Sequence, residues 1–309
     1  MKCKNEGNDI DIMPAASVLI KIIHIALFIL FVFLFPGTGT ASDPTVSPPL
    51  SHPFYPGEKL TFSLRWGIIH AGEATLEVLP LETGNGRVMY HFVMTAETNA
   101  FIDTFYKVRD RIDAFADSGM TRSCLYKKKQ REGKSKRDIT VVFDWEKKEA
   151  RYSNRGKSKP PVSLMPGAFD PLSAFYFARL TDFSKQKILM RPVCDGKRIV
   201  MGEVRVKKRE TVKIGEKSYD TFLLEPNLKD VKGVFEKSKD ASIQLWITAD
   251  ERRIPVKIAS KVVVGSFVGE LLSCTYGSEP EKSAPSAEEM PKRKNTDESG
   301  NRQGAVEQH

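Results

Sequence analysis

The sequence contains few of the residues from which catalytic and metal sites are built. Only 5 of its 309 residues are His and only 4 are Cys. The sequence contains no G-x-S-x-G, H-E-x-x-H, G-x-G-x-x-G or P-loop motif. It therefore lacks the sequence signatures of α/β-hydrolases, zinc peptidases, dinucleotide-binding enzymes and P-loop NTPases. Asp110 and Asp113 are close in sequence, but on an alternating strand they would lie on opposite faces. We therefore expect no enzyme, no metal site and no cofactor.

The cysteines are too few and too widely spaced for a C-x-x-C redox or zinc motif. Cys124, Cys194 and Cys274 remain if the N-terminal segment is removed. One disulfide is possible in an oxidising compartment, with one thiol left over. The sequence does not select among the three pairings.

Only one long hydrophobic run is present, from Ile22 to Phe35. Lysines precede it, and the small residues Gly39 and Ala41 follow at the −3 and −1 positions of a cleavage site. This order predicts a signal peptide over residues 1–41 and a periplasmic protein. The run is shorter than the roughly 20 residues that span a bilayer. The alternative is an uncleaved anchor in the inner membrane.

The two ends of the remaining chain have compositions that do not form a core. Residues 42–56 are rich in Pro and Ser and predict an extended lead-in. Residues 278–309 contain almost no large apolar side chains, so we expect a disordered tail. The folded domain is therefore expected over residues 57–277.

Within this domain the dominant hydrophobic period is two, as in half-buried antiparallel strands. Leu60, Phe62, Leu64 and Trp66 alternate with polar residues. Similar patterns predict strands at 74–78, 88–94, 107–115, 122–130, 137–143, 149–154, 186–192, 198–209, 218–225, 242–248 and 256–273.

Helix signals are few. Asp170 and Pro171 are typical of an N-cap and a first helical residue, and they predict a helix over 170–179. A shorter helix is expected over 100–105. The predicted fold is mainly β: a single curved antiparallel sheet forming an open or closed barrel, with one or two short helices packed against it.

The link between the first two strands is unusually apolar, with Ile68 and Ile69 between Gly67 and Gly72. The glycines permit positive φ or close backbone approach. The two isoleucines either complete the core or line the mouth of a lipid-sized cavity. His70 is expected to be a polar rim residue.

A curved sheet has a concave apolar face that the protein or a ligand must cover. If the helix leaves part of it open, the face would bind an acyl chain or another apolar ligand. The candidate lining residues are Phe62, Leu64, Trp66, Ile68, Ile69, Phe92, Met94 and Trp246.

Positive charge is concentrated between residues 122 and 159, a segment with 14 Lys and Arg residues and only five acidic residues. One interpretation is a solvated sheet edge, on which lysines discourage aggregation. The other is a surface that contacts anionic lipid, glycan or a protein partner through its Lys-rich tip. Nucleic acid is not expected, because no aromatic residues are interleaved for stacking. The candidate contact residues are Lys127, Lys128, Lys129, Arg131, Lys134, Lys136 and Arg137.

Four segments in the same order resemble the exported bacterial proteins of the domain of unknown function 3108 family. They are Tyr55–Leu60 with Trp66-Gly67 and Ala71-Gly72-Glu73-Ala74, Tyr106–Asp110, Phe169-Asp170-Pro171-Leu172-Ser173-Ala174, and Leu245–Val256 with Asp250, Arg253 and Pro255. The last segment predicts a structural hairpin, with a binding role for Arg253 as the alternative.

The resemblance implies a secreted or periplasmic protein of Gram-negative bacteria, with no established activity and no catalytic residues. The expected architecture is similar to that of periplasmic lipoprotein carriers. The sequence thus predicts a non-enzymatic envelope protein that binds a lipid, a lipoprotein or another apolar ligand. The alternative is an envelope scaffold or accessory protein that acts through its basic hairpins.

Overall fold

The computed structural model describes residues 52–84, 86–227, 242–262 and 265–278, and these belong to one compact unit that ends at Glu279. The predicted signal peptide and the tail from residue 279 onward lie outside the described residues, and the lead-in is described only from residue 52.

Fifteen strands form a single sheet in which every pairing is antiparallel. In chain order they are β1 (Lys59–Trp66), β2 (Ile69–Gly84), β3 (Arg87–Thr98), β4 (Arg109–Asp117), β5 (Ser123–Glu132), β6 (Ser135–Asp144), β7 (Glu149–Asn154), β8 (Lys157–Ser158), β9 (Val162–Ser163), β10 (Ile188–Cys194), β11 (Ile199–Ile214), β12 (Lys217–Pro226), β13 (Ser242–Thr248), β14 (Pro255–Val262) and β15 (Gly265–Thr275).

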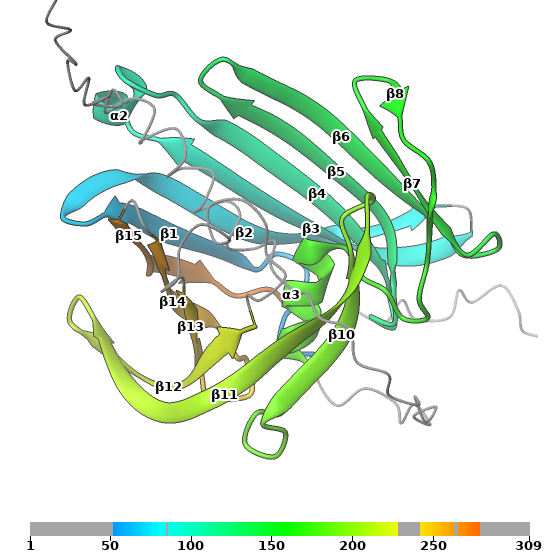
Figure 1. Cartoon of the computed structure of the whole chain (residues 1–309). Helices are drawn as coiled ribbons and strands as arrows, with labels where there is room; N and C mark the ends of the chain where they lie inside the picture. Colours follow the sequence, from blue (N-terminus) through cyan, green and yellow to red (C-terminus); the bar gives the residue numbers. More distant parts are fainter. Residues whose placement is uncertain (1–51, 85, 228–241, 263–264, 279–309) are drawn as a thin grey trace, which may run out of the picture. The chain divides into compact units, whose positions relative to one another are not determined.

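The strand order is β10-β11-β12-β13-β14-β15-β1-β2-β3-β4-β5-β6-β7-β8, with β9 beside β7. The sheet is not closed, but it curls strongly, and β10 passes in front of the opposite half (Figure 1). The chain at Ala168-Phe169 bridges the two halves. The amide of Ser123 on β5 donates to Ala168 O, and the amide of Phe169 donates to Pro192 O on β10. The predicted single antiparallel, barrel-like sheet is confirmed, and of the two predicted forms it takes the open one.

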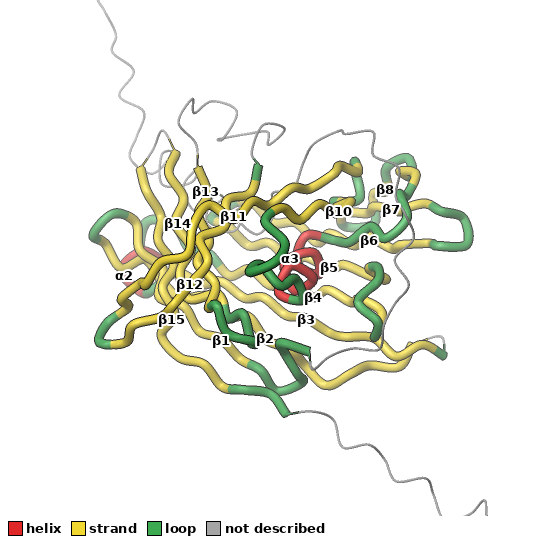
Figure 2. Tube along the Cα trace, turned by 90° about the horizontal axis from the view of Figure 1, so that it is seen from below, coloured by secondary structure: helices red, strands yellow, loops and turns green. Residues whose placement is uncertain are grey.

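Two short helices accompany the sheet, α2 (Ala100–Asp103) and α3 (Pro171–Arg179). Asp170 caps α3 as predicted, because its carboxylate accepts from the amides of Leu172 and Ser173 at 2.9 Å. The helix lies inside the curl of the sheet (Figures 1 and 2), and nearly all its residues are buried. It therefore supplies one layer of the core and the sheet supplies the other.

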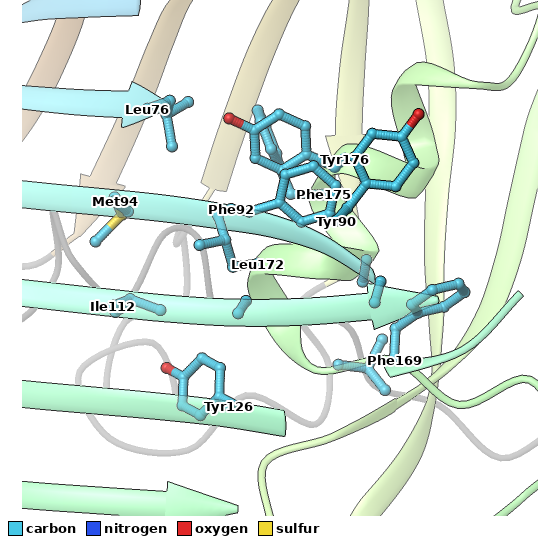
Figure 3. Packing of buried hydrophobic residues seen from close by; sticks show 14 of the residues in the cluster. Leu76, Tyr90, Phe92, Met94, Ile112, Tyr126, Phe169, Leu172, Phe175 and Tyr176 are labelled. Atoms are coloured by element: carbon cyan, nitrogen blue, oxygen red, sulfur yellow. The ribbon is translucent and has the colours of Figure 1, made fainter. Parts of the chain in front are cut away.

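The alternating pattern explains which strand residues face α3. Leu60, Phe62, Leu76 and Phe92 are buried on the inner face together with helix residues such as Tyr176. The rings of Phe92 and Tyr176 stack with centroids 3.9 Å apart, as seen in Figure 3. This packing turns the middle of the concave face into an ordinary apolar core.

The structure corrects the predicted strand over residues 256–273, which is two strands, β14 and β15. Their hairpin lacks the Asn-Gly or Asp-Gly pair that usually marks a tight turn, so the sequence did not indicate a break. The two-residue strands β8 and β9 were also not predicted. In the part of the chain that is described, no helix has the length and hydrophobicity needed to cross a bilayer.

Candidate apolar binding site

An apolar cavity of about 70 Å³ opens on the concave face beside α3. Residues of β1, β2, β3, α3, β13 and β14 line it, and Lys257 is the only charged one. The lining residues are Phe62, Leu64, Ala74, Leu76, Met94, Phe175, Leu245, Pro255, Lys257 and Ile258. Figure 3 shows Leu76 and Met94 on neighbouring strands, with Phe175 on the helix.

Two glycines lie opposite Leu64, one on each neighbouring strand. Leu64 pairs with Gly72 on β2 and with Gly269 on β15, so neither neighbouring strand places a side chain beside it. A Cβ added at Gly269 would lie 2.9 Å from the Ile258 side chain and 3.4 Å from that of Leu64. The Ile258 and Leu64 side chains therefore pack over Gly269, and both of them line the cavity.

The structure places three of the eight predicted lining residues in the cavity: Phe62, Leu64 and Met94. Phe92 is covered by Tyr176 instead. Trp66 is partly buried against the core but outside the cavity lining.

Trp246 is also absent from the cavity lining. Its indole nitrogen donates to Glu210 Oε1 at 2.9 Å, and the ammonium of Lys257 lies 5.7 Å from its ring centroid. A register irregularity between Trp246 and Ile247 interrupts the alternation at this point.

Ile68 and Ile69 neither complete the core nor line the cavity, the two positions expected for them. Ile68 is 99% exposed and Ile69 is 39% exposed. Gly67 has a φ of +54° and turns the chain beyond the end of the sheet, so Ile68 projects outward and does not fold over the concave face. The neighbouring His70 is an exposed rim residue, as predicted, and its carbonyl accepts from Asn99 Nδ2 at 2.7 Å.

Sequence reasoning did not name seven of the ten cavity residues as lining residues. Ala74 and Leu76 alternate correctly with polar neighbours, so the pattern already places them on the inner face. Phe175 lies on the predicted apolar face of the helix. The remaining residues, from β13 and β14, come from a part of the chain where bulges and the unpredicted hairpin obscure the alternation.

The predicted anionic-contact residues do not form one surface. Lys127 and Lys129 are exposed, whereas Lys128 is buried on the opposite face of β5. Arg131 pairs with Asp138 at 2.6 Å. Lys134, Lys136 and Arg137 are exposed at the β5–β6 turn.

A buried polar cluster on β4 and β5 escaped sequence reasoning. It contains Asp110, Lys128 and Glu132, all at most 8% exposed. Burial raises the pKa of Asp110 to about 7; the Arg131 amide opposes this shift, and the nearby Glu132 carboxyl reinforces it. Burial likewise lowers the pKa of Lys128. The cluster can hold a proton near neutral pH, and no local sequence signal marks it because its members meet across strands.

On the opposite face of β4, Asp113 belongs to a separate network. It accepts from His91 Nε2 at 3.0 Å and from the guanidinium of Arg111. Burial alone would raise its pKa, but these two partners outweigh that effect and hold the pKa of Asp113 below its usual range. Asp110 and Asp113 thus face opposite sides of the sheet, as predicted.

The predicted structural-motif residues have backbone roles. A Cβ on Gly72 would lie 2.0 Å from Glu97 O, so only glycine fits there. Glu73 is exposed on β2. Asp170 also accepts a 2.6 Å hydrogen bond from Ser123 Oγ, and Pro171 begins α3.

The β13–β14 hairpin contains the other predicted motif residues. Asp250 accepts from the amides of Arg252 and Arg253 at 3.1 Å, and Pro255 lies next to the strand irregularity. The guanidinium of Arg253 donates to Arg179 O at the end of α3. These contacts fit the predicted structural hairpin.

Among the described residues, the three cysteines form no disulfide. Cys124, Cys194 and Cys274 are free thiols. Over the described ranges, no three His, Cys, Asp or Glu side chains gather in a way that would hold a metal ion.

Residues 61–272 match the model of DUF3108, described as a protein of unknown function. The chain belongs to the DUF3108 family. This match confirms the resemblance drawn from the four sequence segments. No curated protein matches the sequence.

Three solved structures are similar to this DUF3108 protein. A β-barrel-like DUF1849 protein from Brucella abortus has a TM-score of 0.50 and 12% identity, covering 73% of this chain and 99% of its own. The hypothetical protein CT021 from Chlamydia trachomatis has a TM-score of 0.33 and 7% identity, and the match covers 73% of this chain and 90% of CT021. A protein from Bacteroides fragilis, described as a putative exported protein with a YmcC-like fold, has a TM-score of 0.25 and 9% identity, and the match covers 72% of this chain and 98% of that protein. At 12% identity, the similarity to the DUF1849 protein indicates a shared fold and nothing further.

Proposed function

We propose that this DUF3108 protein is a non-enzymatic protein of the bacterial periplasm that binds an apolar chain, such as the acyl chain of a lipid or lipoprotein, on its concave face. The observation that carries the proposal is the cavity beside α3, whose lining is apolar except for Lys257. Concave apolar sites with few polar groups are the usual form of small-molecule sites. The predicted signal peptide supports the periplasmic location.

The size of the cavity limits how a ligand would enter. At about 70 Å³ it is smaller than the ~150 Å³ cavity that accepts benzene in a well-studied protein core. An acyl chain would therefore displace lining side chains on entry. Met94 suits this role because its unbranched thioether changes rotamer easily. Phe175, in the middle of α3, is the second side chain that would move.

A fluorescent polyene fatty acid tests the proposal by titration into a chain that begins at Ser42, which retains every described residue. We expect saturable binding that unlabelled fatty acid displaces. Leu64→Phe should project a larger side chain into the cavity and weaken binding at least tenfold. Met94→Leu conserves volume and should keep binding within about twofold.

Thermal unfolding of each variant separates lost binding from lost folding. If Leu64→Phe is unstable, Ala74→Phe is a second variant that should fill the same cavity. Absence of saturable binding by the parent protein, or equal binding by folded filled-cavity variants, would refute the proposal.

A further inference from the structure

One end of the sheet exposes a group of large apolar side chains. Ile68 is 99% exposed, Phe101 and Phe105 are each 62% exposed, and Ile69 is 39% exposed. The rings of Phe101 and Phe105 lie edge to face with centroids 5.6 Å apart. We call these four residues the apolar tip. Single exposed apolar residues are common, but a group of them marks a binding surface.

Backbone contacts hold the parts of the tip at the same end of the sheet. The amide of Asn99, which caps α2, donates to Ala71 O at 3.0 Å, next to the β1–β2 turn. The amide of Gly133 in the β5–β6 turn donates to Lys107 O at 2.9 Å. The segment from Asn99 to Lys107 therefore connects both turns, and Figure 1 shows α2 beside them.

Lysines surround the apolar tip. Lys107 follows Phe105 closely, Lys134 and Lys136 lie at the β5–β6 turn, and Lys261 pairs with Ser266, whose carbonyl accepts from Gly67. All four are exposed. Among the described residues, none of these ammonium groups forms an ion pair.

Three acidic residues near the tip lie in ion pairs. Asp103 pairs with Arg109 at 2.6 Å, and Glu97 lies 3.6 Å from the same guanidinium. Glu270 pairs with Arg65 at 2.7 Å. Asp103 and Glu97 share one arginine, and Glu73 is exposed on β2. The four lysines with Arg65 and Arg109 outnumber these three acids and Glu270, so this end of the sheet carries excess positive charge.

We propose that the apolar tip and its four lysines form a docking surface for an anionic lipid bilayer. Ile68, Phe101 and Phe105 insert into the boundary between headgroups and acyl chains, and Lys107, Lys134, Lys136 and Lys261 contact the headgroups. Apolar side chains flanked by basic residues are the usual composition of surfaces that lie in a membrane interface.

The features of the tip favour a bilayer over a protein partner. A stable protein interface buries about 800 Å² on each partner and has few charges at its centre. Here the apolar groups lie on a turn, a four-residue helix and the loop that follows it, with lysines around them. Such projecting groups suit a soft, anionic surface, and each lysine near it should strengthen binding about fivefold.

Vesicle co-sedimentation tests this proposal with the chain that begins at Ser42. We expect binding to phosphatidylglycerol vesicles, weaker binding to phosphatidylcholine vesicles, and loss of binding as salt increases. The triple variant Ile68→Ser, Phe101→Ser, Phe105→Ser should bind phosphatidylglycerol at least tenfold more weakly. The control Val88→Ser, Ile188→Ser, Met190→Ser removes exposed apolar residues elsewhere and should bind within about twofold of the parent.

A matched pair of charge variants separates local from overall charge. Lys134→Glu with Lys136→Glu alters the β5–β6 turn, and Lys147→Glu with Lys148→Glu alters the β6–β7 turn at the opposite end of those strands. Only the first pair should weaken binding at least tenfold. The full chain's charge changes equally in both variants, so equal effects would overturn the docking surface.

Insertion itself has a spectroscopic signature. When phosphatidylglycerol vesicles are added to Phe105→Trp, the tryptophan fluorescence that this variant has in excess of the parent should shift to shorter wavelength. An unshifted difference spectrum, or triple and control variants that bind equally, would contradict the proposal. So would self-association through the tip without vesicle binding.

Discussion

The guanidinium of Arg179 lies 2.6 Å from the carboxylate of Glu58, and both side chains are at most 2% exposed. Arg179 also donates to the backbone carbonyls of Pro53 and Arg252. The pair thus joins the last turn of α3 to the segment before β1 and to the β13–β14 turn. Three segments that carry the family resemblance, far apart in the sequence, meet at or beside this contact.

Arg179→Met should lower the free energy of unfolding by about 3–5 kcal/mol, because it leaves Glu58 as an uncompensated buried charge. The double variant Glu58→Leu, Arg179→Met should lose less than the sum of the two single variants. Urea unfolding curves measure all three. Strictly additive losses would show that the two charges do not depend on each other.

Gly72→Ala should destabilise the protein by about 3 kcal/mol, because the new Cβ would overlap Glu97 O on β3. Gly67→Ala is the matched control. It has a φ of +54° but no atom within 4 Å of the added Cβ, so its cost should be about 1 kcal/mol. Thermal unfolding distinguishes the two, and equal losses would contradict the close-approach argument.

Asp110 should make stability depend on pH. Its pKa of about 7 is above the unfolded value near 3.9, so the folded state binds more protons between these values. This contribution is fully present below about pH 4 and is lost as pH rises through 7.

Asp110→Asn should therefore flatten the decline in unfolding free energy between pH 5 and pH 8. Urea unfolding at a series of pH values measures the effect. Asp113→Asn serves as a contrast, since the pKa of Asp113 is lowered and its contribution should be lost only at acidic pH. If the unfolding free energy of Asp110→Asn declines with pH as steeply as that of the parent, another group causes the decline.

Asp170→Ala should cost about 3 kcal/mol, because it removes the cap of α3 and the buried hydrogen bond from Ser123. Asp170→Asn keeps an oxygen that can accept from the helix amides and should cost less. Chemical denaturation compares them, and equal costs would mean that the charge, not the cap, stabilises this helix end.

The alternation of apolar and polar residues predicted most of the sheet because one face of each strand is buried. β7 and β13 have the predicted bounds, and Asp170 with Pro171 located α3. The pattern failed at Ile68, where a positive-φ glycine directs an apolar side chain outward. Alternation assigns a face to strand residues but not to turn residues.

The candidate cavity was predictable only in part. Phe62, Leu64 and Met94 follow from the face on which each strand is buried. What surrounds them depends on which residues lie opposite in the folded register, here Gly72 and Gly269 with Leu64. The Asp110, Lys128 and Glu132 cluster likewise forms only when β4 and β5 pair. The register between paired strands is not readable from local sequence.

Native mass spectrometry of the Ser42–His309 protein, purified gently from a bacterial periplasm, tests the central claim most directly. The account predicts an additional mass of lipid or fatty-acid size that disappears on organic extraction and is reduced in folded Leu64→Phe protein. A bare mass for the parent, or the same adduct on both proteins, would contradict binding in the cavity beside α3.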